Sequence, residues 1–235
     1  VTGVQTCALP IFLRKVKILA RMSHPNLVAA YEAGQRGGTY YLAMEYVDGH
    51  DLRSILKTRG ALGVDEAVGY VAQAAAGLGY AHSHGVYHRN VKPSNLLVDK
   101  QGVVKLVGLG LAHVDASDLV SENSLGAELT AQGQVMGTCD FMAPEQAVDA
   151  RSVDARADIY GLGCTLHALL TGRPPYPGKS PMQQVVAHRS QPIPSLPSVR
   201  CDVSGRLQRV FQAVSVPRTQ SSDASAASPA APNAQ

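Results

Sequence analysis

The chain has 235 residues, of which 45% are hydrophobic and 17% are charged, and its formal net charge is +3. These values are typical of a soluble globular protein that can bury one sizeable core. The small charge and the scattered basic residues argue against nucleic acid as a partner. No apolar run approaches the roughly 20 residues needed to cross a bilayer. The four cysteines form no C-x-x-C pair, so we expect a cytoplasmic protein without a cysteine zinc site.

The two ends of the chain differ from its middle. Residues 1–10 show neither apolar periodicity nor turn chemistry that leads into the next segment, and they read like a fusion scar or a misassembled leader. Residues 215–235 are mainly Ser, Ala and Pro. Such a segment buries too little apolar surface to offset the entropy of ordering, so we expect it to be disordered.

The first part of the chain predicts a helix packed on antiparallel strands. Apolar residues share one helical face between Ile11 and Met22, and Pro25 follows the expected helix end. Leu27 to Ala33 and Thr39 to Val47 have the composition of strands, and glycines separate them.

The middle of the chain predicts a long helix, a hairpin and a long loop. Asp65 to Tyr80 has apolar residues at helical spacing, and its two acidic residues at the start complement the helix dipole. Leu96 to Val98 and Val103 to Val107 predict two short strands joined by a tight turn. The polar segment from His113 to Gln134 predicts a loop, and loops of this length are usually functional or mobile.

The last part of the chain predicts three further helices. Asp158 to Leu170 is the most apolar of them and ends before Gly172, so we expect it to run through the core. Pro181 to Arg189 and Val203 to Val214 show weaker helical patterns, and a proline-rich connection separates them.

One polar segment carries most of the functional information. It reads His88-Arg89-Asn90-Val91-Lys92-Pro93-Ser94-Asn95. It resembles the catalytic loop of Ser/Thr protein kinases, H-R-D-x-K-P-x-N, at every fixed position except Asn90, where the family has its catalytic aspartate.

Further motifs lie at the spacing of the same family. They are Ser23-His24-Pro25-Asn26, the hinge Met44-Glu45-Tyr46-Val47, Gly137-Thr138, the A-P-E motif in Met142-Ala143-Pro144-Glu145-Gln146, and Asp158-Ile159-Tyr160-Gly161-Leu162-Gly163. The chain is therefore similar, from about Ile11 to Gln212, to the eukaryotic-like bacterial Ser/Thr protein kinases. The resemblance implies an α+β, protein kinase-like fold. It has a partial N-terminal lobe at 11–47, with helix αC and two or more antiparallel strands, and a mainly helical C-terminal lobe at 48–214.

The resemblance also implies ATP and Mg²⁺ as cofactors, because the family transfers phosphate with both. It places Asn90 at the catalytic base, and an amide has no useful basicity at neutral pH. It places Gly108 at the metal-binding aspartate of the D-F-G motif, which leaves Asn95 as the expected metal ligand. It places Lys15 at the glutamate of αC, and the family's Gly-rich loop and strand lysine fall upstream of Ile11. These departures weigh against ATP and Mg²⁺ binding in this chain.

Other site residues are assigned by the same resemblance. The catalytic set comprises His88, Arg89, Asn90, Lys92 and Asn95; the adenine and ribose set comprises Met44, Glu45, Val47, Asp51 and Leu97; and the activation and P+1 set comprises Thr130, Thr138, Pro144 and Glu145. The resemblance stacks His88, Leu109, Leu19 and Ala30 in a regulatory spine that Asp158 anchors. In the family, the glutamate at the position of Glu145 pairs with an arginine of the last helix of the domain. That helix lies beyond the segment of this chain that resembles the family.

Two residue groups have a simpler interpretation beside the functional one. Arg89 lies where the family receives a phosphate, here on Thr130 or Ser124, but the favoured interpretation is that it only bonds nearby carbonyls. His82, His84 and His88 are interpreted as packing and loop-bonding residues, not as a zinc site.

Three functions remain open at this point. The first is a catalytically impaired pseudokinase that binds protein partners, and the second is an active Ser/Thr kinase whose remaining lobe lies upstream, with a protein as its substrate. The third is a gene fragment without function. Restored phosphoryl transfer after Asn90→Asp and Gly108→Asp would indicate a recently lost enzyme.

Overall fold

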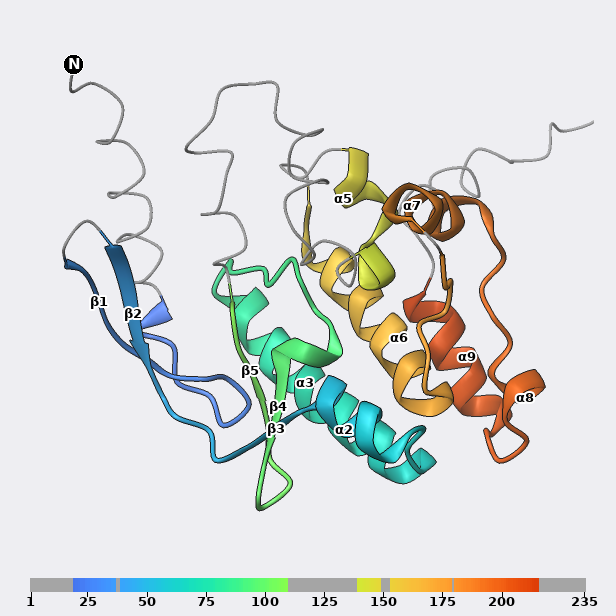
Figure 1. The fold of residues 1–235 in the computed structure, drawn as a ribbon, viewed down its shortest axis with the longest axis horizontal. Coiled ribbons are helices and arrows are strands. Elements are labelled where there is room, and N and C mark those ends of the chain that lie inside the picture. Colours follow the sequence, from blue (N-terminus) through green and yellow to red (C-terminus); the bar gives the residue numbers. More distant parts are fainter. Residues whose placement is uncertain (1–18, 37–38, 110–138, 149–152, 179, 216–235) are drawn as a thin grey trace, which may run out of the picture.

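The computed structural model describes residues 19–36, 39–109, 139–148, 153–178 and 180–215. In this part, a β-hairpin and a three-stranded sheet lie toward one side, and helices build the other side (Figure 1). The predicted α+β architecture is confirmed. None of the helices described here is long and apolar enough to cross a lipid bilayer.

The strands form two separate antiparallel sheets. Their bounds are β1 (Ala30–Arg36) and β2 (Thr39–Met44) in the hairpin, and β3 (Gly49–Asp51), β4 (Leu96–Asp99) and β5 (Val104–Leu106), in that order, in the second sheet. The hairpin register pairs Ala30 with Met44 and is interrupted by a bulge before Glu32.

A short segment before β1 links the two sheets. Leu27 forms a parallel bridge with Leu106, and the N–H of Val28 donates to the C=O of Leu106 at 3.0 Å. The N–H of Leu106 in turn donates to the C=O of Asn26 at 2.9 Å. The start of the hairpin is thereby fixed to β5.

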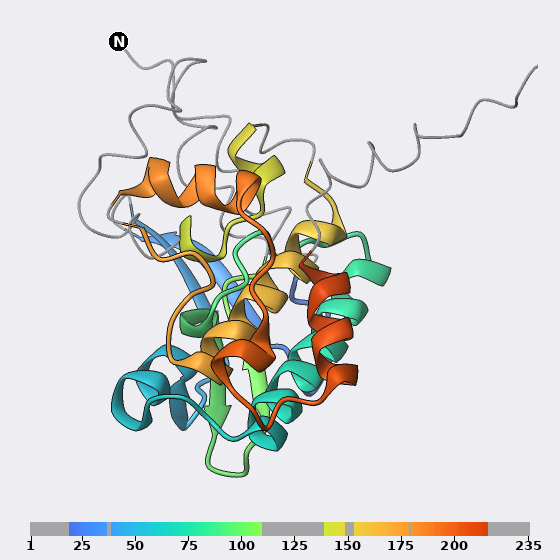
Figure 2. The same cartoon turned by 90° about the vertical axis from the view of Figure 1, so that its right-hand side faces the viewer.

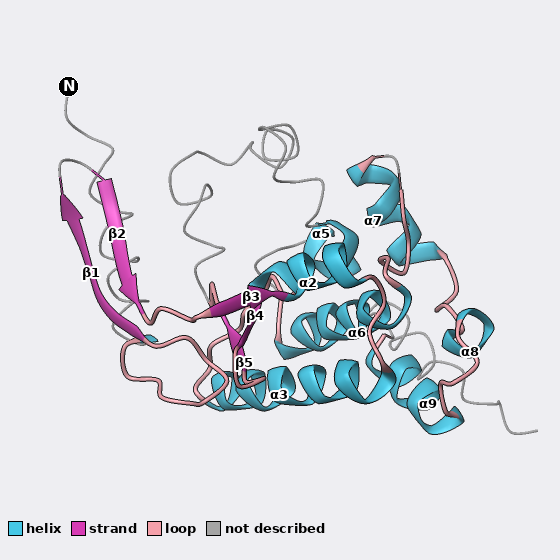
Figure 3. Cartoon of the chain, turned by 60° about the horizontal axis from the view of Figure 1, so that its bottom comes forward, coloured by secondary structure: helices cyan, strands magenta, loops and turns pink. Residues whose placement is uncertain are grey.

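The helices contain more of the described residues than the strands do. Their bounds are α2 (Leu52–Arg59), α3 (Val64–Ser83), α5 (Pro144–Val148), α6 (Ala155–Thr171), α7 (Pro181–Ser190), α8 (Leu196–Val199) and α9 (Gly205–Val214), with 3₁₀ turns η1 (Pro93–Asn95) and η3 (Cys139–Phe141). Helices α3 and α6 lie side by side in Figure 3, and α9 packs on α6 in Figure 2.

Helix α6 is buried along nearly its whole length because its sequence is apolar on all sides. The Asp154 carboxylate caps its start by accepting the N–H of Arg156 at 2.9 Å, and Gly172, in the left-handed conformation with φ of 77°, ends it. A Cβ atom added at Gly161 would lie 2.9 Å from the C=O of Val91. The loop that carries Val91 therefore approaches the helix backbone at a distance that only glycine permits.

Most predicted elements form, with shifted ends. The helices expected at 65–80, 158–170, 181–189 and 203–214 are observed at 64–83, 155–171, 181–190 and 205–214. The strand expected at 27–33 begins instead at Ala30, because the residues before it pair with β5. Helix α2 and strand β3 were not predicted, and α8 forms inside the expected proline-rich connection, where Pro197 fits the first turn because it needs no amide donor there.

Several predictions fall wholly or partly outside the described residues. They concern the leader at 1–10, most of the helix at 11–22, the loop at 113–134 and the tail after residue 215. Ser215 itself is described: it is 6% exposed, and it forms the C-cap of α9 by donating its N–H to the C=O of Gln212 and Phe211. Ser215 therefore has an ordered position at the end of α9, in contrast to its expected place in the tail.

Candidate functional site

The loop from His88 to Asn95 lies between α3 and β4, and a buried carboxylate from α6 holds its start. Asp158 is 1% exposed. Its Oδ2 atom accepts the N–H of His88 at 2.8 Å, and its Oδ1 atom accepts the N–H of Arg89 at 2.6 Å. Arg89 has a positive φ of 63°, a conformation that costs roughly 1–2 kcal/mol for a residue with a side chain. The two bonds from Asp158 stabilise this turn of the backbone.

The histidines near this carboxylate have separate partners. His82 Nε2 lies 2.8 Å from Asp158 Oδ2, whereas His84 packs on the ring of Tyr80 at 4.5 Å between centroids. Full burial lowers the pKa of His88 and keeps its imidazole neutral. The neutral ring donates Nε2–H to the C=O of Val107 at 3.0 Å, so its Nδ1 can accept the N–H of Asn90 at 3.3 Å. His88 thus joins the loop to the end of β5.

Hydrogen bonds join Asn95 to Asn90 and to Val107, the residue before Gly108. The Asn95 amide donates Nδ2–H to the C=O of Asn90 at 2.8 Å, and the C=O of Asn95 accepts the N–H of Val107 at 3.0 Å. Gly108 has a φ of +84°, and a Cβ atom added there would meet no atom within 4 Å. The space at position 108 would admit a side chain, but the positive φ would strain any residue other than glycine there, and the sequence supplies no carboxylate.

These side chains do not fit Mg²⁺. The ion needs near-octahedral oxygen ligands and is usually bound through carboxylates. At this place the chain offers the amide of Asn95 and no acidic side chain at 90 or 108. Among the residues that the structure describes, no three His, Cys, Asp or Glu side chains gather in a group that could hold a metal ion.

Lys92 lies at the start of η1 and is partly buried. Burial lowers the pKa of its ammonium, and the nearby charge of Arg53 lowers that pKa further. Arg53 belongs to α2, whose first turn is capped by Asp51: one carboxylate oxygen accepts the N–H of Ser54 at 3.0 Å, and the other accepts the Ser54 hydroxyl at 2.7 Å. The expected ribose contact of Asp51 would compete with this cap.

The hinge segment is fixed by a partly buried ion pair. Glu45 Oε1 lies 2.7 Å from Lys105 Nζ of β5, and Glu45 Oε2 accepts the N–H of Ala29 at 3.2 Å. Its partner Lys105 holds the pKa of the Glu45 carboxyl below its usual value. Two other residues expected at the nucleotide also have defined places: Val47 follows β2, and Leu97 of β4 pairs with Asp51 of β3.

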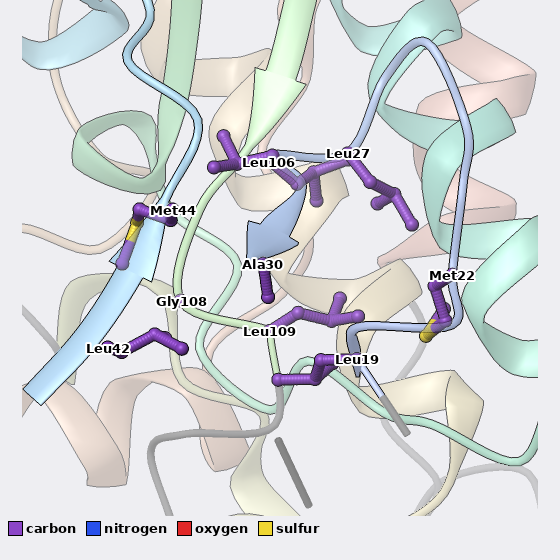
Figure 4. A pocket seen from close by; sticks show the side chains of 10 residues that line it. Leu19, Met22, Leu27, Ala30, Leu42, Met44, Leu106, Gly108 and Leu109 are labelled. Atoms are coloured by element: carbon purple, nitrogen blue, oxygen red, sulfur yellow. The ribbon is translucent and has the colours of Figure 1, made fainter. Parts of the chain in front are cut away.

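An apolar cavity of about 30 Å³ lies between the hairpin and β5 (Figure 4). Leu42 and Met44 of β2 line one side, and Leu19 and Leu109 line another. Three of the four expected spine residues, Leu19, Ala30 and Leu109, therefore meet around one space. The side chains of Ala30 and Leu109 do not fill this space.

The A-P-E segment is bound to the loop through Gln146. Its amide donates Nε2–H to the C=O of Arg89 at 2.8 Å, and its Oε1 accepts the N–H of Ala143 at 3.1 Å. Pro144 and Glu145 begin α5, and the Glu145 carboxylate is buried with no hydrogen-bond partner for Oε2 in the described part of the chain. Thr130, Ser124 and Thr138 lie outside the described residues, as does Lys15.

Two polar groups near the site were missed in the sequence. On α3, the Gln73 amide accepts the N–H of Val104 at 2.9 Å and donates to the C=O of Gly102 at 3.1 Å, which fixes the β4–β5 hairpin. On α7, Gln184 donates to Asp140 of η3 at 2.6 Å. Gln73 lies among the apolar residues of α3, and that conflict with the helical pattern is the signal that could have found it. Helix α7 buries Gln184 beside Ala187 and His188 and has no apolar face, so its sequence gives no such signal.

Comparison with known proteins places these motifs in context. The Protein kinase domain family matches residues 5–224. The chain is 38% identical over 205 residues to the serine/threonine-protein kinase PknB of Mycolicibacterium smegmatis, a match that covers 85% of this chain and 31% of the relative. It is 39% identical over 194 residues to PknB of Mycobacterium tuberculosis strain H37Ra, which covers 80% of this chain and 29% of the relative.

A solved structure supports the same similarity. The crystal structure of Rad53 residues 1–466 in complex with AMP-PNP matches with a TM-score of 0.69 and 25% identity, over 87% of this chain and 49% of that one. The chain therefore spans about a third of the length of the curated relatives it matches.

Proposed function

Because the chain belongs to the bacterial, eukaryotic-like branch of the Ser/Thr protein kinase family, we propose that it is a catalytically impaired kinase domain that acts by binding protein partners. One contrast supports the proposal: the hydrogen bonds that position the catalytic loop are present, whereas the carboxylates that would act as base and metal ligand are not. Asp158 still bonds the backbone of His88 and Arg89, and His88 still bonds β5. The two positions that would hold the base and the metal carry Asn90 and Gly108.

The expected rate penalty follows from general acid–base and metal catalysis. Loss of one general base typically lowers a rate by about 10² to 10⁴. Loss of the metal carboxylate does not simply multiply this factor, because the catalytic parts act as a unit. We therefore expect phosphoryl transfer from ATP to protein at or near the uncatalysed rate.

The proposal extends to nucleotide binding. The Rad53 structure contains AMP-PNP, and in the family the hinge backbone, here at Glu45 and Val47, binds the adenine. Because position 108 is a glycine, the chain lacks the carboxylate that would hold Mg²⁺. Without this ion, the phosphates of ATP lose a binding partner. We expect calorimetry to find no Mg²⁺-dependent ATP binding, and a clear Mg²⁺-dependent titration would contradict this expectation.

A phosphotransfer assay tests the proposal directly. It uses the longest natural protein that contains this chain, labelled ATP and a generic protein substrate, with the wild type, Asn90→Asp, Gly108→Asp and the double variant. We expect a silent wild type. Gly108→Asn is the matched control, because asparagine also tolerates a positive φ but offers no carboxylate. Activity in the wild type would overturn the proposal.

The alternative is an active Ser/Thr kinase within a longer protein. The curated relatives that match at 38% and 39% identity are named serine/threonine-protein kinases, which favours it. The same assay decides between the two, because only this alternative predicts transfer without Asn90→Asp and Gly108→Asp.

A further inference from the structure

The segment 139–146 and the loop from His88 to Asn95 meet on the same part of α6. The segment consists of η3 and the start of α5, and η3 packs on α6. A Cβ atom added at Gly161 of α6 would lie 2.9 Å from the C=O of Val91 in the loop and 3.3 Å from the C=O of Phe141 in the segment. The two backbones therefore approach α6 at one glycine, although they are far apart in the chain.

Gln146 makes a direct hydrogen bond between the segment and the loop. Its partly buried side chain donates Nε2–H to the C=O of Arg89 at 2.8 Å. Its Oε1 atom accepts the N–H of Ala143, a fully buried residue, at 3.1 Å. A side-chain amide offers both a donor and an acceptor, whereas a carboxylate offers acceptors only. The amide of Gln146 is therefore suited to both bonds at once.

The bond from Gln146 reaches the loop where its backbone most needs support. Arg89 has a positive φ, and its N–H donates to Asp158 Oδ1 of α6 at 2.6 Å. Its peptide groups are thus held by α6 at the N–H and by the segment 139–146 at the C=O. The other end of the segment is held as well, because Asp140 Oδ1 accepts the Gln184 amide of α7 at 2.6 Å. A backbone conformation of this kind persists only where its surroundings fix it.

We propose that Gln146 is a positioning residue that makes the segment 139–146 and the loop from His88 to Asn95 open and close as one unit. When the segment moves away, the C=O of Arg89 loses its donor, and when the loop moves, the Gln146 amide loses its acceptor. A protein that binds one of the two therefore orders the other, because such a coupling is reciprocal. This coupling goes beyond the proposed function, since it exists whether or not the chain transfers phosphate.

Hydrogen exchange of the longest natural protein that contains this chain tests the coupling without ATP or a partner. The variant Gln146→Glu keeps an acceptor for Ala143 but loses the donor for Arg89. We expect amide exchange to become at least about fivefold faster in both the segment and the loop, as for the loss of one ordinary hydrogen bond. Exchange in the middle of α3 and α6 should stay unchanged.

Two further variants separate this effect from charge. Gln146→Met lacks both the donor and the acceptor, so it should loosen the loop as much as Gln146→Glu does without adding a charge. Gln212→Glu is the matched control, because it makes the same chemical change at an exposed position of α9. Faster exchange in only one of the two segments would overturn the proposal. Faster exchange throughout α3 and α6 would overturn it too, because Gln146 would then stabilise the whole domain.

A double-variant cycle measures the coupling itself. Asp158→Asn weakens the support of the loop from the side of α6. With Gln146 present, we expect this loosening to spread to the segment 139–146, and in the Gln146→Met background we expect it to stay in the loop. An equal increase of exchange in the segment with and without Gln146 would refute the role of its amide.

Discussion

The bonds from Asp158 to the backbone predict a large loss of stability when that carboxylate is removed. Asp158→Ala leaves the N–H groups of His88 and Arg89 without their partner in the interior. Each unsatisfied buried donor costs about 1–3 kcal/mol, so the two donors together cost about 2–6 kcal/mol. We expect a loss of this size, which is a large share of the roughly 5–15 kcal/mol that stabilises a typical domain.

Urea unfolding followed by circular dichroism measures this loss. Asp154→Ala is the control, since it removes a carboxylate from the start of the same helix, where the cap is worth about 1 kcal/mol. Asp158→Asn keeps one acceptor oxygen and should lose about half as much as Asp158→Ala, which gives a measurable variant if the alanine form does not fold. A loss in Asp158→Ala no larger than that in Asp154→Ala would refute the reasoning.

Three further predictions concern packing and pH. Leu109→Phe should fill the cavity of about 30 Å³. At about 24 cal/mol per Å³, this should raise the free energy of unfolding by up to about 0.7 kcal/mol, measured as an increase in Tm. A lower Tm would mean that the cavity cannot accept the ring. Gly161→Ala should lower Tm, because its Cβ would press on the C=O of Val91 at 2.9 Å, and an unchanged Tm would show that the loop can move. Burial lowers the pKa of His188 to about 4, so the unfolded chain binds a proton first as pH falls below about 6.5, and the wild type should lose stability between pH 6.5 and 4. His188→Gln should lose less over that range in urea unfolding, and equal losses would contradict the assignment.

The fold could be predicted from the sequence where local patterns agree with tertiary contacts. Helix α6 has an apolar pattern, a capping aspartate and a C-terminal glycine, and all three appear in the structure. Helix α2 was missed because most of its residues are polar or charged and only Leu52 is fully buried. Strand β3 was missed because three residues give no periodic pattern, and its pairing partner β4 lies about 45 residues later.

The site could be predicted only in part. The residue types at positions 90 and 108 could be read from the sequence, because the surrounding motifs identify the two positions where the family has aspartate. The Glu45–Lys105 ion pair and the contact of Gln146 with the C=O of Arg89 join residues far apart in the chain. No local propensity encodes such pairs, so they form only once the fold has brought the segments together.

The hairpin of β1 and β2 has a consequence for motion. A two-stranded sheet is at best marginally stable on its own, and this one is fixed to the second sheet mainly by residues 26–28 and by the ion pair of Glu45 with Lys105. Its amide protons should therefore exchange with solvent through local opening, whereas those of α6 should exchange only when the whole domain unfolds. The cavity behind Met44 would then open and close whenever the hairpin frays. This local opening should occur far more often than unfolding of the helical part of the molecule.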